Sequence, residues 1–310
     1  MKKVYSLVLF GTFLSAIGPA ILKNVLSVGQ MNRNFGISLI LLMGGFSATV
    51  IYLTDSFVNY KNSDKKRIKL SVSEMIQLTL CGFFTAVHYI TFVIAMQIGS
   101  VTETAMIVRV GPVMAILMGH FFLNEKVKSW KIMIISSALC LGSVLLMQDL
   151  STTSLGQNST IAILFGILCA FAGALKRTLT RNITSKKESL PKLFVVAVSM
   201  MVGGLFMSMG GLVITSFTGE ELFSLPSMNQ SLMLTFLGIN SVIYGSITIW
   251  ACRATGDMGV VNFLDYLTPL FGGIAAYFIC GEKGFNYPNL VLSFMFVSLG
   301  VYLFDRAQKK

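Results

Sequence analysis

The feature that most restricts the fold of this chain is a series of long apolar runs separated by short polar segments. Ten runs of roughly 17–25 residues follow one another, each long enough for a helix to cross a bilayer core about 30 Å thick. Charged residues make up 12% of the chain, about half the share in an average soluble domain, and 54% of residues are hydrophobic. The sequence therefore predicts an all-α integral membrane protein with ten transmembrane helices, because a soluble fold could not bury so much apolar surface. The runs lie at approximately 4–26, 35–57, 74–97, 102–123, 130–148, 160–180, 193–217, 231–251, 258–279 and 288–305.

Basic residues lie mostly in the segments that fall on the same side of the membrane as the N-terminus. Of the 24 Lys and Arg, 20 lie there or at the adjoining span ends, six of them from Lys176 to Lys192, around the end of the sixth run and before the seventh. Cytoplasmic loops carry the excess of Lys and Arg, so both termini are expected in the cytoplasm, with the protein in the cell inner membrane. The net charge of +11 is thus a topology signal, and nucleic acid is not an expected partner. The five cysteines do not occur at metal-ligand spacing, and neither a metal nor a cofactor is expected.

A short polar stretch occurs twice in the chain, each time between two apolar runs. FLNEKVKSW begins at Phe122 and ICGEKGFNY at Ile279, 157 residues later, and a proline precedes both Glu-Lys pairs by the same distance. Each copy of the repeat holds five runs, and an odd number makes the second copy enter the membrane from the opposite side. The sequence thus predicts a 5+5 inverted-topology repeat, with a first repeat at 1–150 and a second at 155–310. Such repeats recur in secondary transporters, where substrate binds near the midplane at the repeat interface.

The two copies also share an order of elements: a proline, a stretch of small residues, a Gly/Asn-Glu-Lys turn and a closing apolar run that contains glycine. The first copy reads VRVGPVMAILMGHFFLNEKVKSWKIMIISSALCLGSVLL at 108–146, and the second DYLTPLFGGIAAYFICGEKGFNYPNLVLSFMFVSLGVYLF at 265–304. In these features the chain resembles the drug/metabolite transporter superfamily, in its ten-helix EamA-type branch. The resemblance implies that helices 4 and 9 face each other and that the chain transports a small molecule.

The repeated Glu-Lys pairs fall at the membrane surface, one pair at each face. Glu125 and Lys126 are expected at the inner face, and Glu282 and Lys283 at the outer face. One interpretation is a structural turn that ends one span and begins the next. The alternative is a gate, in which each glutamate holds its turn against a neighbouring helix in one of two alternating states. Their surface position makes neither pair a substrate ligand.

Two charged residues are expected well inside spans, at equivalent places of the two copies. Arg109 and Asp265 each lie roughly 10 Å deep, and a charge at that depth by default faces a cavity and serves function. Pro112 and Pro269 are expected to kink the same helices and to free backbone carbonyls beside the two charges. The pattern favours binding of the two ends of a zwitterion or small charged metabolite. An internal Arg–Asp pair that only holds the bundle together is the alternative.

Five polar or aromatic side chains on helices 3, 8 and 9 complete the candidate substrate-binding site. The residues are His88, Tyr89, Tyr244, Asn262 and Tyr266. They would line a cavity together with Arg109 and Asp265. Hydrogen bonding between helices is the alternative role for any one of them.

Taken together, these patterns favour a secondary active transporter over an enzyme, a channel or a scaffold. No metalloprotease or phosphate-loop motif is present, and an enzyme is not expected. The expected cargo is a small polar or zwitterionic metabolite, amino-acid-like or nucleoside-like, moved by alternating access. A multidrug exporter of lipophilic cations is the alternative, although the first run contains no acidic residue to bind such a cation. Coupling to protons or to a counter-substrate stays open, as does assembly as a monomer or a loose homodimer.

Overall fold

The computed structural model of this 310-residue chain consists of α-helices and one short 3-10 helix in the part that it describes. The described residues are 2–28, 33–58, 70–98, 104, 107–108, 110–124, 129–146, 157–186, 190–218, 226–255, 265–281 and 287–309. At some helix positions, including Pro112, Asp265 and Pro269, only the backbone is described.

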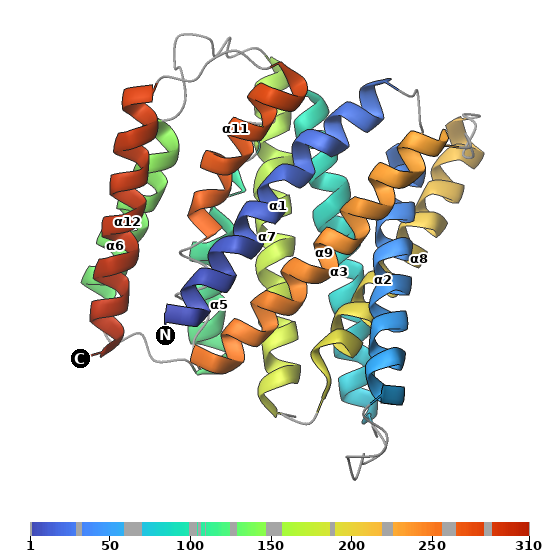
Figure 1. The fold of residues 1–310 in the computed structure, drawn as a ribbon, viewed down its shortest axis with the longest axis horizontal. Helices are drawn as coiled ribbons and strands as arrows, with labels where there is room; N and C mark the ends of the chain where they lie inside the picture. The colour runs from blue at the N-terminus through green and yellow to red at the C-terminus, as the bar shows by residue number, and fades with distance from the viewer. Residues whose placement is uncertain are drawn as a thin grey trace.

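The helices form one bundle and run roughly along a common direction, with α1 and α9 inclined across the others (Figure 1). In the centre, α3 packs against α7 and α8, α2 against α8 and α9, and α1 against α9 and α11. Helices α6 and α12 pair with each other at one edge of the bundle. The elements are α1 (Lys2–Val28), α2 (Arg33–Val58), α3 (Val72–Ile98), α5 (Val110–Leu123), α6 (Trp130–Leu146), α7 (Gln157–Lys186), α8 (Lys192–Thr218), α9 (Met228–Thr255), η2 (Asp265–Leu267), α11 (Thr268–Cys280) and α12 (Tyr287–Lys309).

Helices α3 and α9 begin in the same way, with a reciprocal pair of hydrogen bonds called a capping box. At α3, the Ser71 backbone N–H donates to Glu74 Oε2 over 2.7 Å, and the Glu74 N–H donates to Ser71 Oγ over 3.3 Å. At α9, the Ser227 N–H donates to Gln230 Oε1 over 2.8 Å, and the Gln230 N–H donates to Ser227 Oγ over 3.3 Å. These bonds satisfy backbone donors that a helix start otherwise leaves without partners.

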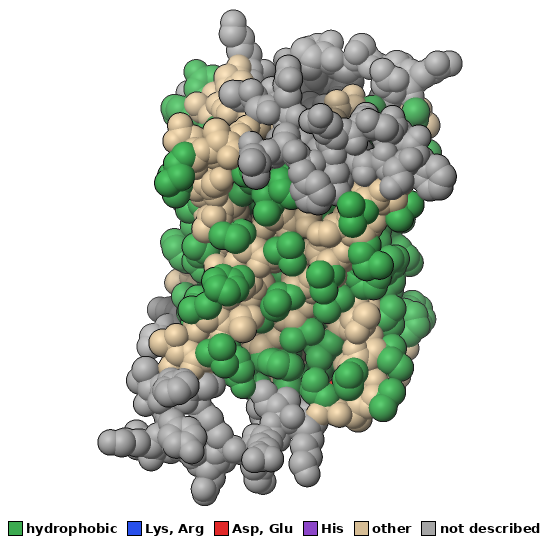
Figure 2. All heavy atoms as spheres, turned by 90° about the vertical axis from the view of Figure 1, so that its right-hand side faces the viewer, with side chains coloured by type: hydrophobic (Ala, Val, Ile, Leu, Met, Phe, Trp, Pro, Cys, Tyr) green, Lys and Arg blue, Asp and Glu red, His purple; other side chains and the backbone are tan. Residues whose placement is uncertain are grey.

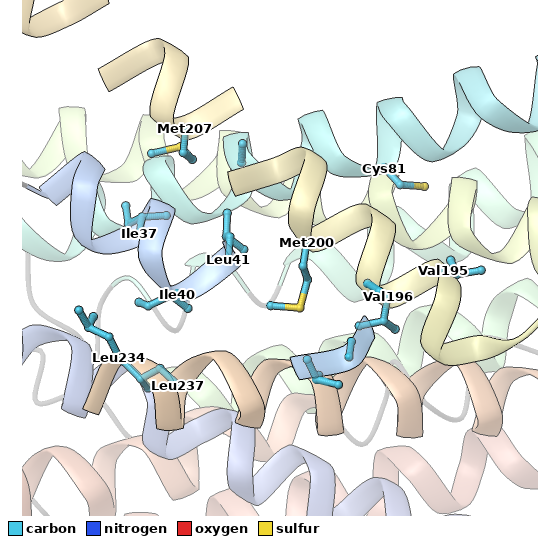
Figure 3. Close-up of a cluster of buried hydrophobic side chains, with 14 of the residues drawn as sticks. Ile37, Ile40, Leu41, Cys81, Val195, Val196, Met200, Met207, Leu234 and Leu237 are labelled. Carbon is cyan, nitrogen blue, oxygen red and sulfur yellow. The ribbon is translucent and has the colours of Figure 1, made fainter. Parts of the chain in front are cut away.

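The larger of two buried apolar clusters joins α2, α3, α8 and α9 (Figure 3). Its side chains interdigitate between helices that are distant in sequence, and several are completely enclosed. The labelled members are Ile37, Ile40, Leu41, Cys81, Val195, Val196, Met200, Met207, Leu234 and Leu237. A second cluster joins the start of α1 to α5, α6, α11, η2 and α12. The space between the two clusters is where the candidate site lies.

The outer surface of the bundle is apolar, as a lipid-facing surface must be. Figure 2 shows hydrophobic side chains spread over the middle of one face. Large side chains are strongly exposed, among them Phe46 at 62%, Met209 at 64% and Phe278 at 79%. Within the described residues, six helices are long and apolar enough to cross a membrane, namely α1, α2, α3, α7, α8 and α9. The chain is therefore a multi-pass membrane protein.

The structure describes only part of the runs expected at 102–123, 130–148 and 258–279, whereas α12 covers the whole run expected at 288–305. The apolar helical stretches in α5, α6, α11 and α12 have 10–17 residues. The helix around Pro112 begins only at Val110, and the one around Pro269 begins at Thr268, directly after the 3-10 turn η2. Both prolines thus lie in the first turn of a helix, where a missing N–H costs nothing, and not at the interior kinks that we expected.

Helix α7 is longer than the predicted run at 160–180. It continues to Lys186, so Arg181 is a helical residue, as are Lys176 and Arg177 within the predicted run. The end of the run was predicted too early because Arg181 and Lys186 carry the charge that is typical of a cytoplasmic loop.

Candidate functional site

An internal cavity of about 260 Å³ lies between the two buried clusters and is the candidate site. Residues of α1, α3, α7, α8 and α9 form most of its wall, together with the beginnings of α5 and α11. It extends from the middle of the bundle toward the end where α7 finishes and α8 begins, because Thr184 and Val195 line it. Both halves of the chain therefore contribute to one cavity.

One face of α7 carries the charges of the cavity. Its lining positions recur at helical spacing, and they change from small residues to cations and hydroxyls along the helix. These positions are Ala170, Gly173, Ala174, Lys176, Arg177, Thr180, Arg181 and Thr184. Among the lining residues that the structure describes there is no Asp or Glu. Sequence reasoning missed this cationic face, although the spacing of Gly173, Arg177 and Arg181 was a signal that could have found it.

The cationic face is tied to the opposite wall through Arg177. Its Nη2 atom donates a hydrogen bond of 3.1 Å to the phenol oxygen of Tyr244 on α9. This bond fixes the orientation of the planar guanidinium fork on the cavity wall. Tyr244 was expected to line a cavity, and it does.

A second pair of hydroxyls links α3 to α9 across the site. Tyr89 Oη and Ser241 Oγ lie 2.7 Å apart, and both residues line the cavity. Ser241 also donates to the Leu237 carbonyl over 2.9 Å, which uses its one proton. The phenol of Tyr89 is therefore the donor in the interhelical bond.

His88 lines the cavity as well, and its ring orientation follows from its contacts with α7. Nδ1 lies 3.0 Å from the Cys169 carbonyl oxygen, which can only accept, so Nδ1 carries a proton. The Cys169 thiol donates back to the His88 carbonyl over 3.4 Å. Gly173 makes this approach possible, because an ideal Cβ there would lie 3.0 Å from Nδ1. On its other side the ring stacks on Phe92, with centroids 6.4 Å apart.

Asn240 adds a buried amide to the cavity wall. Its Nδ2 donates to the Leu14 carbonyl on α1 over 2.7 Å. Its Oδ1 has no hydrogen-bond partner within the described part of the chain. Asn240 lines the cavity, so its Oδ1 atom is one of the hydrogen-bond acceptors of the cavity wall.

The remaining predicted residues fall into three groups. Tyr266 is 1% exposed in the second apolar cluster and is not among the lining residues, so the position expected for it is wrong: η2 packs its ring into the core. Asp265 begins η2, and its side chain is not described. Six others lie outside the described residues, namely Arg109, Asn262, Glu125, Lys126, Glu282 and Lys283.

The sequence and fold can now be compared with known proteins. Residues 2–148 match the EamA-like transporter family. The match covers nearly all of the first predicted repeat. The resemblance noted from the sequence is thus confirmed, and the chain is a membrane transporter. The match to a transporter family points away from an enzyme.

The similarity to known proteins extends over the whole length of the chain. An uncharacterized transporter of Clostridium kluyveri is 22% identical over 312 aligned residues, 100% of this chain and 95% of the relative. The uncharacterized transporter YxxF of Bacillus subtilis is 29% identical over 119 residues, 38% of each chain. A protein of known crystal structure has a TM-score of 0.70 at 13% identity, with 96% of both chains covered, and it shares the fold.

Proposed function

We propose that this chain is a secondary transporter of the inner membrane that moves a small polar or zwitterionic metabolite by alternating access. The cavity carries the proposal, since it places hydroxyl, amide, imidazole and cationic groups inside an apolar bundle. Polar groups at such depth are costly, and they are expected where they contact a substrate or water. Substrate would bind between the two halves, as in other transporters built from inverted repeats.

The packing of the helices supports the proposed 5+5 repeat. If α1, α2, α3, α5 and α6 correspond to α7, α8, α9, α11 and α12, each of the extensively packed pairs has a packed counterpart. The contacts α3–α7, α5–α7 and α2–α9 correspond to α9–α1, α11–α1 and α8–α3, while α2–α8 and α6–α12 map onto themselves. A bundle without internal symmetry has no reason to satisfy this exchange.

Two local details repeat with the same register. Asn124 and Gly281 lie 157 residues apart, and each has a positive φ, 55° and 65° respectively. Asn and Gly are the residues that adopt this left-handed conformation most readily, and each stands just before a Glu-Lys pair. The capping boxes at Ser71 and Ser227 also fall at corresponding helix starts, within one residue of the same offset.

One difference between the corresponding pairs supports alternating access. The contact of α3 with α7 is the most extensive in the bundle, whereas α9 and α1 pack over much less of their length. In an inverted repeat, exchanging the two packings produces the second conformation, with the cavity open to the other side. Unequal packing of the pairs α3–α7 and α9–α1 is expected if the structure represents one of these two conformations.

Arg109 and Asp265 remain proposed ligands for the two ends of the substrate. Val108, the chain neighbour of Arg109, lines the cavity, and so does Thr268 near Asp265. The alternative function, export of lipophilic cations, is disfavoured by Lys176 and Arg177, because like charges in a cavity repel a cationic cargo.

A bulky substitution in the cavity tests the proposed function. Thr248 lines the cavity on α9, so Thr248→Trp is expected to reduce counterflow of a transported metabolite in proteoliposomes by about tenfold or more through steric exclusion. The metabolite would be chosen by a thermal-shift screen of a polar metabolite library against the purified protein. Arg109→Ala and Asp265→Asn would be assayed beside it.

The matched control is Thr79→Trp, which makes the same change on the exposed surface of α3. It is expected to transport like the wild type, and both proteins should elute as folded species in size exclusion. If Thr248→Trp transports at the wild-type rate, the cavity is not the route of transport.

A further inference from the structure

We infer that the substrate of this cavity is a small organic anion, whose carboxylate or phosphate group binds to Lys176 and Arg177. The inference rests on the proposed function and narrows its substrate class from polar metabolites in general to those of net negative charge.

The two cations are neighbours in sequence and contact the same cavity from α7. Lys176 is half-buried, and its ammonium makes no hydrogen bond or ion pair with any described residue. Its Nζ therefore offers three donors to whatever occupies the cavity. Arg177 is oriented by its bond to Tyr244, and both cationic side chains line the same cavity. Carboxylate and phosphate are the groups that such a pair binds best, because their oxygens accept charge-assisted bonds.

The depth of Lys176 within the span argues against the view that this residue only sets the orientation of α7 in the membrane. The apolar span in α7 runs from Thr160 to Thr184, and Lys176 lies about 12 Å inside its basic end at 1.5 Å per residue. Basic residues that mark the cytoplasmic side lie at span ends or in loops. A cation inside a span is costly, and two side by side also repel each other. A bound anion offsets both costs, which no neutral or cationic substrate would do.

The rest of the wall defines the size and nature of the anion. A volume of about 260 Å³ lies near the lower end for small-molecule sites, which are typically about 300–1,000 Å³. Tyr89, Phe92 and Tyr244 provide aromatic surface for a carbon skeleton, and Thr180 adds a hydroxyl beside the cations. The cavity thus fits a compact carboxylate or phosphate ester and excludes polymers and lipids.

The test compares small probes of different charge on the wild-type protein. Succinate and glycerol 3-phosphate represent the two anion chemistries, alanine a zwitterion, glycerol a neutral polyol, and tetraphenylphosphonium a lipophilic cation. We expect one or both anions to raise the melting temperature and to exchange in proteoliposome counterflow, whereas the other probes do neither. Which anion responds separates carboxylate from phosphate.

Variants then assign the effect to the two residues. Lys176→Gln and Arg177→Gln are expected to weaken binding of the active anion by about tenfold or more, because each removes a charge-assisted bond. Lys131→Gln is the matched control, since Lys131 is exposed at the start of α6 and does not line the cavity. It should bind the anion like the wild type.

The outcomes separate the two proposals. If alanine, glycerol or tetraphenylphosphonium stabilises the wild-type protein in preference to the anions, the anion inference is overturned and the transporter proposal stands. Equal anion affinity in Lys176→Gln, Arg177→Gln and wild type also overturns it. If Thr248→Trp leaves exchange of the active probe unchanged, the proposed function itself fails. Because probe selectivity is measured on the wild type, a variant that does not fold leaves the test intact.

Discussion

At the scale of single residues, the hydroxyls that line the cavity have defined donor and acceptor roles. Ser241 donates its one hydroxyl proton to the Leu237 carbonyl of its own helix. The 2.7 Å contact with Tyr89 therefore uses the proton of the phenol. Removing the serine leaves the phenol without this acceptor, whereas removing the phenol leaves Ser241 with its bond to Leu237. Hydrogen bonds between helices in membranes average about 0.6 kcal/mol and reach about 1.7 kcal/mol.

Ser241→Ala is therefore expected to lower the free energy of unfolding by about 0.6–1.7 kcal/mol, and Tyr89→Phe by less. The measurement is reversible unfolding in detergent micelles, with the double variant completing a cycle whose coupling energy should be about 0.6 kcal/mol. Ser47→Ala is the matched control, because Ser47 bonds only to the Met43 carbonyl on its own exposed helix surface. A Ser241→Ala effect no larger than that of Ser47→Ala would contradict the assignment.

At the scale of helices, backbone contact between α2 and α9 depends on two glycines. An ideal Cβ on Gly238 would lie 2.8 Å from the Gly44 nitrogen and 2.8 Å from the Ile40 carbonyl oxygen. These are backbone atoms on a packed helix, and they cannot move aside as a flexible side chain does. Small residues at such crossings are what let membrane helices approach closely, since burial of apolar surface does not drive them together in lipid.

We expect Gly238→Ala to destabilise the protein by about 1–3 kcal/mol, because the added methyl group forces α2 and α9 apart. Thermal unfolding followed by circular dichroism measures the change. Gly210→Ala in α8 is the control, since a Cβ added there would have nothing within 4 Å, and it should be neutral or stabilising by up to about 1 kcal/mol. If the two variants melted alike, the close crossing would not limit stability.

At the scale of the whole molecule, the distribution of charge and the order of helices predict the same orientation. The basic end of the bundle holds the end of α7 and the start of α8, and the cavity extends toward it. If this end is cytoplasmic, the proposed anion site is reached from the cytoplasm in the packing seen here.

Fusion reporters check the orientation in a bacterial host. A fluorescent protein joined after α12 should fluoresce, and alkaline phosphatase at the same place should be inactive, because the fusion point is expected in the cytoplasm. Phosphatase fused after α8, at Thr218, should be active, since that helix is expected to end outside. Activity at the C-terminal fusion, with none after α8, would reverse the proposed topology.

Sequence alone was sufficient for every property that depends on local composition. The apolar runs predicted an all-helical membrane protein, and the paired proline and Glu-Lys segments carried the family resemblance that residues 2–148 confirm. Capping boxes such as Ser71 with Glu74 are also readable, because three residues define them. His88, Tyr89 and Tyr244 line the cavity as expected, although their contact with a substrate stays a prediction.

Only the tertiary structure decided which residues meet across the bundle. The bond from Arg177 to Tyr244 joins residues 67 apart, and it depends on how α7 and α9 are rotated about their axes. In lipid both faces of a helix are apolar, so periodicity does not reveal the inward face as it does in a soluble helix. For the same reason the buried position of Tyr266 became visible only once the helices were packed, whereas the spacing of Gly173, Arg177 and Arg181 already indicated the cationic face of α7.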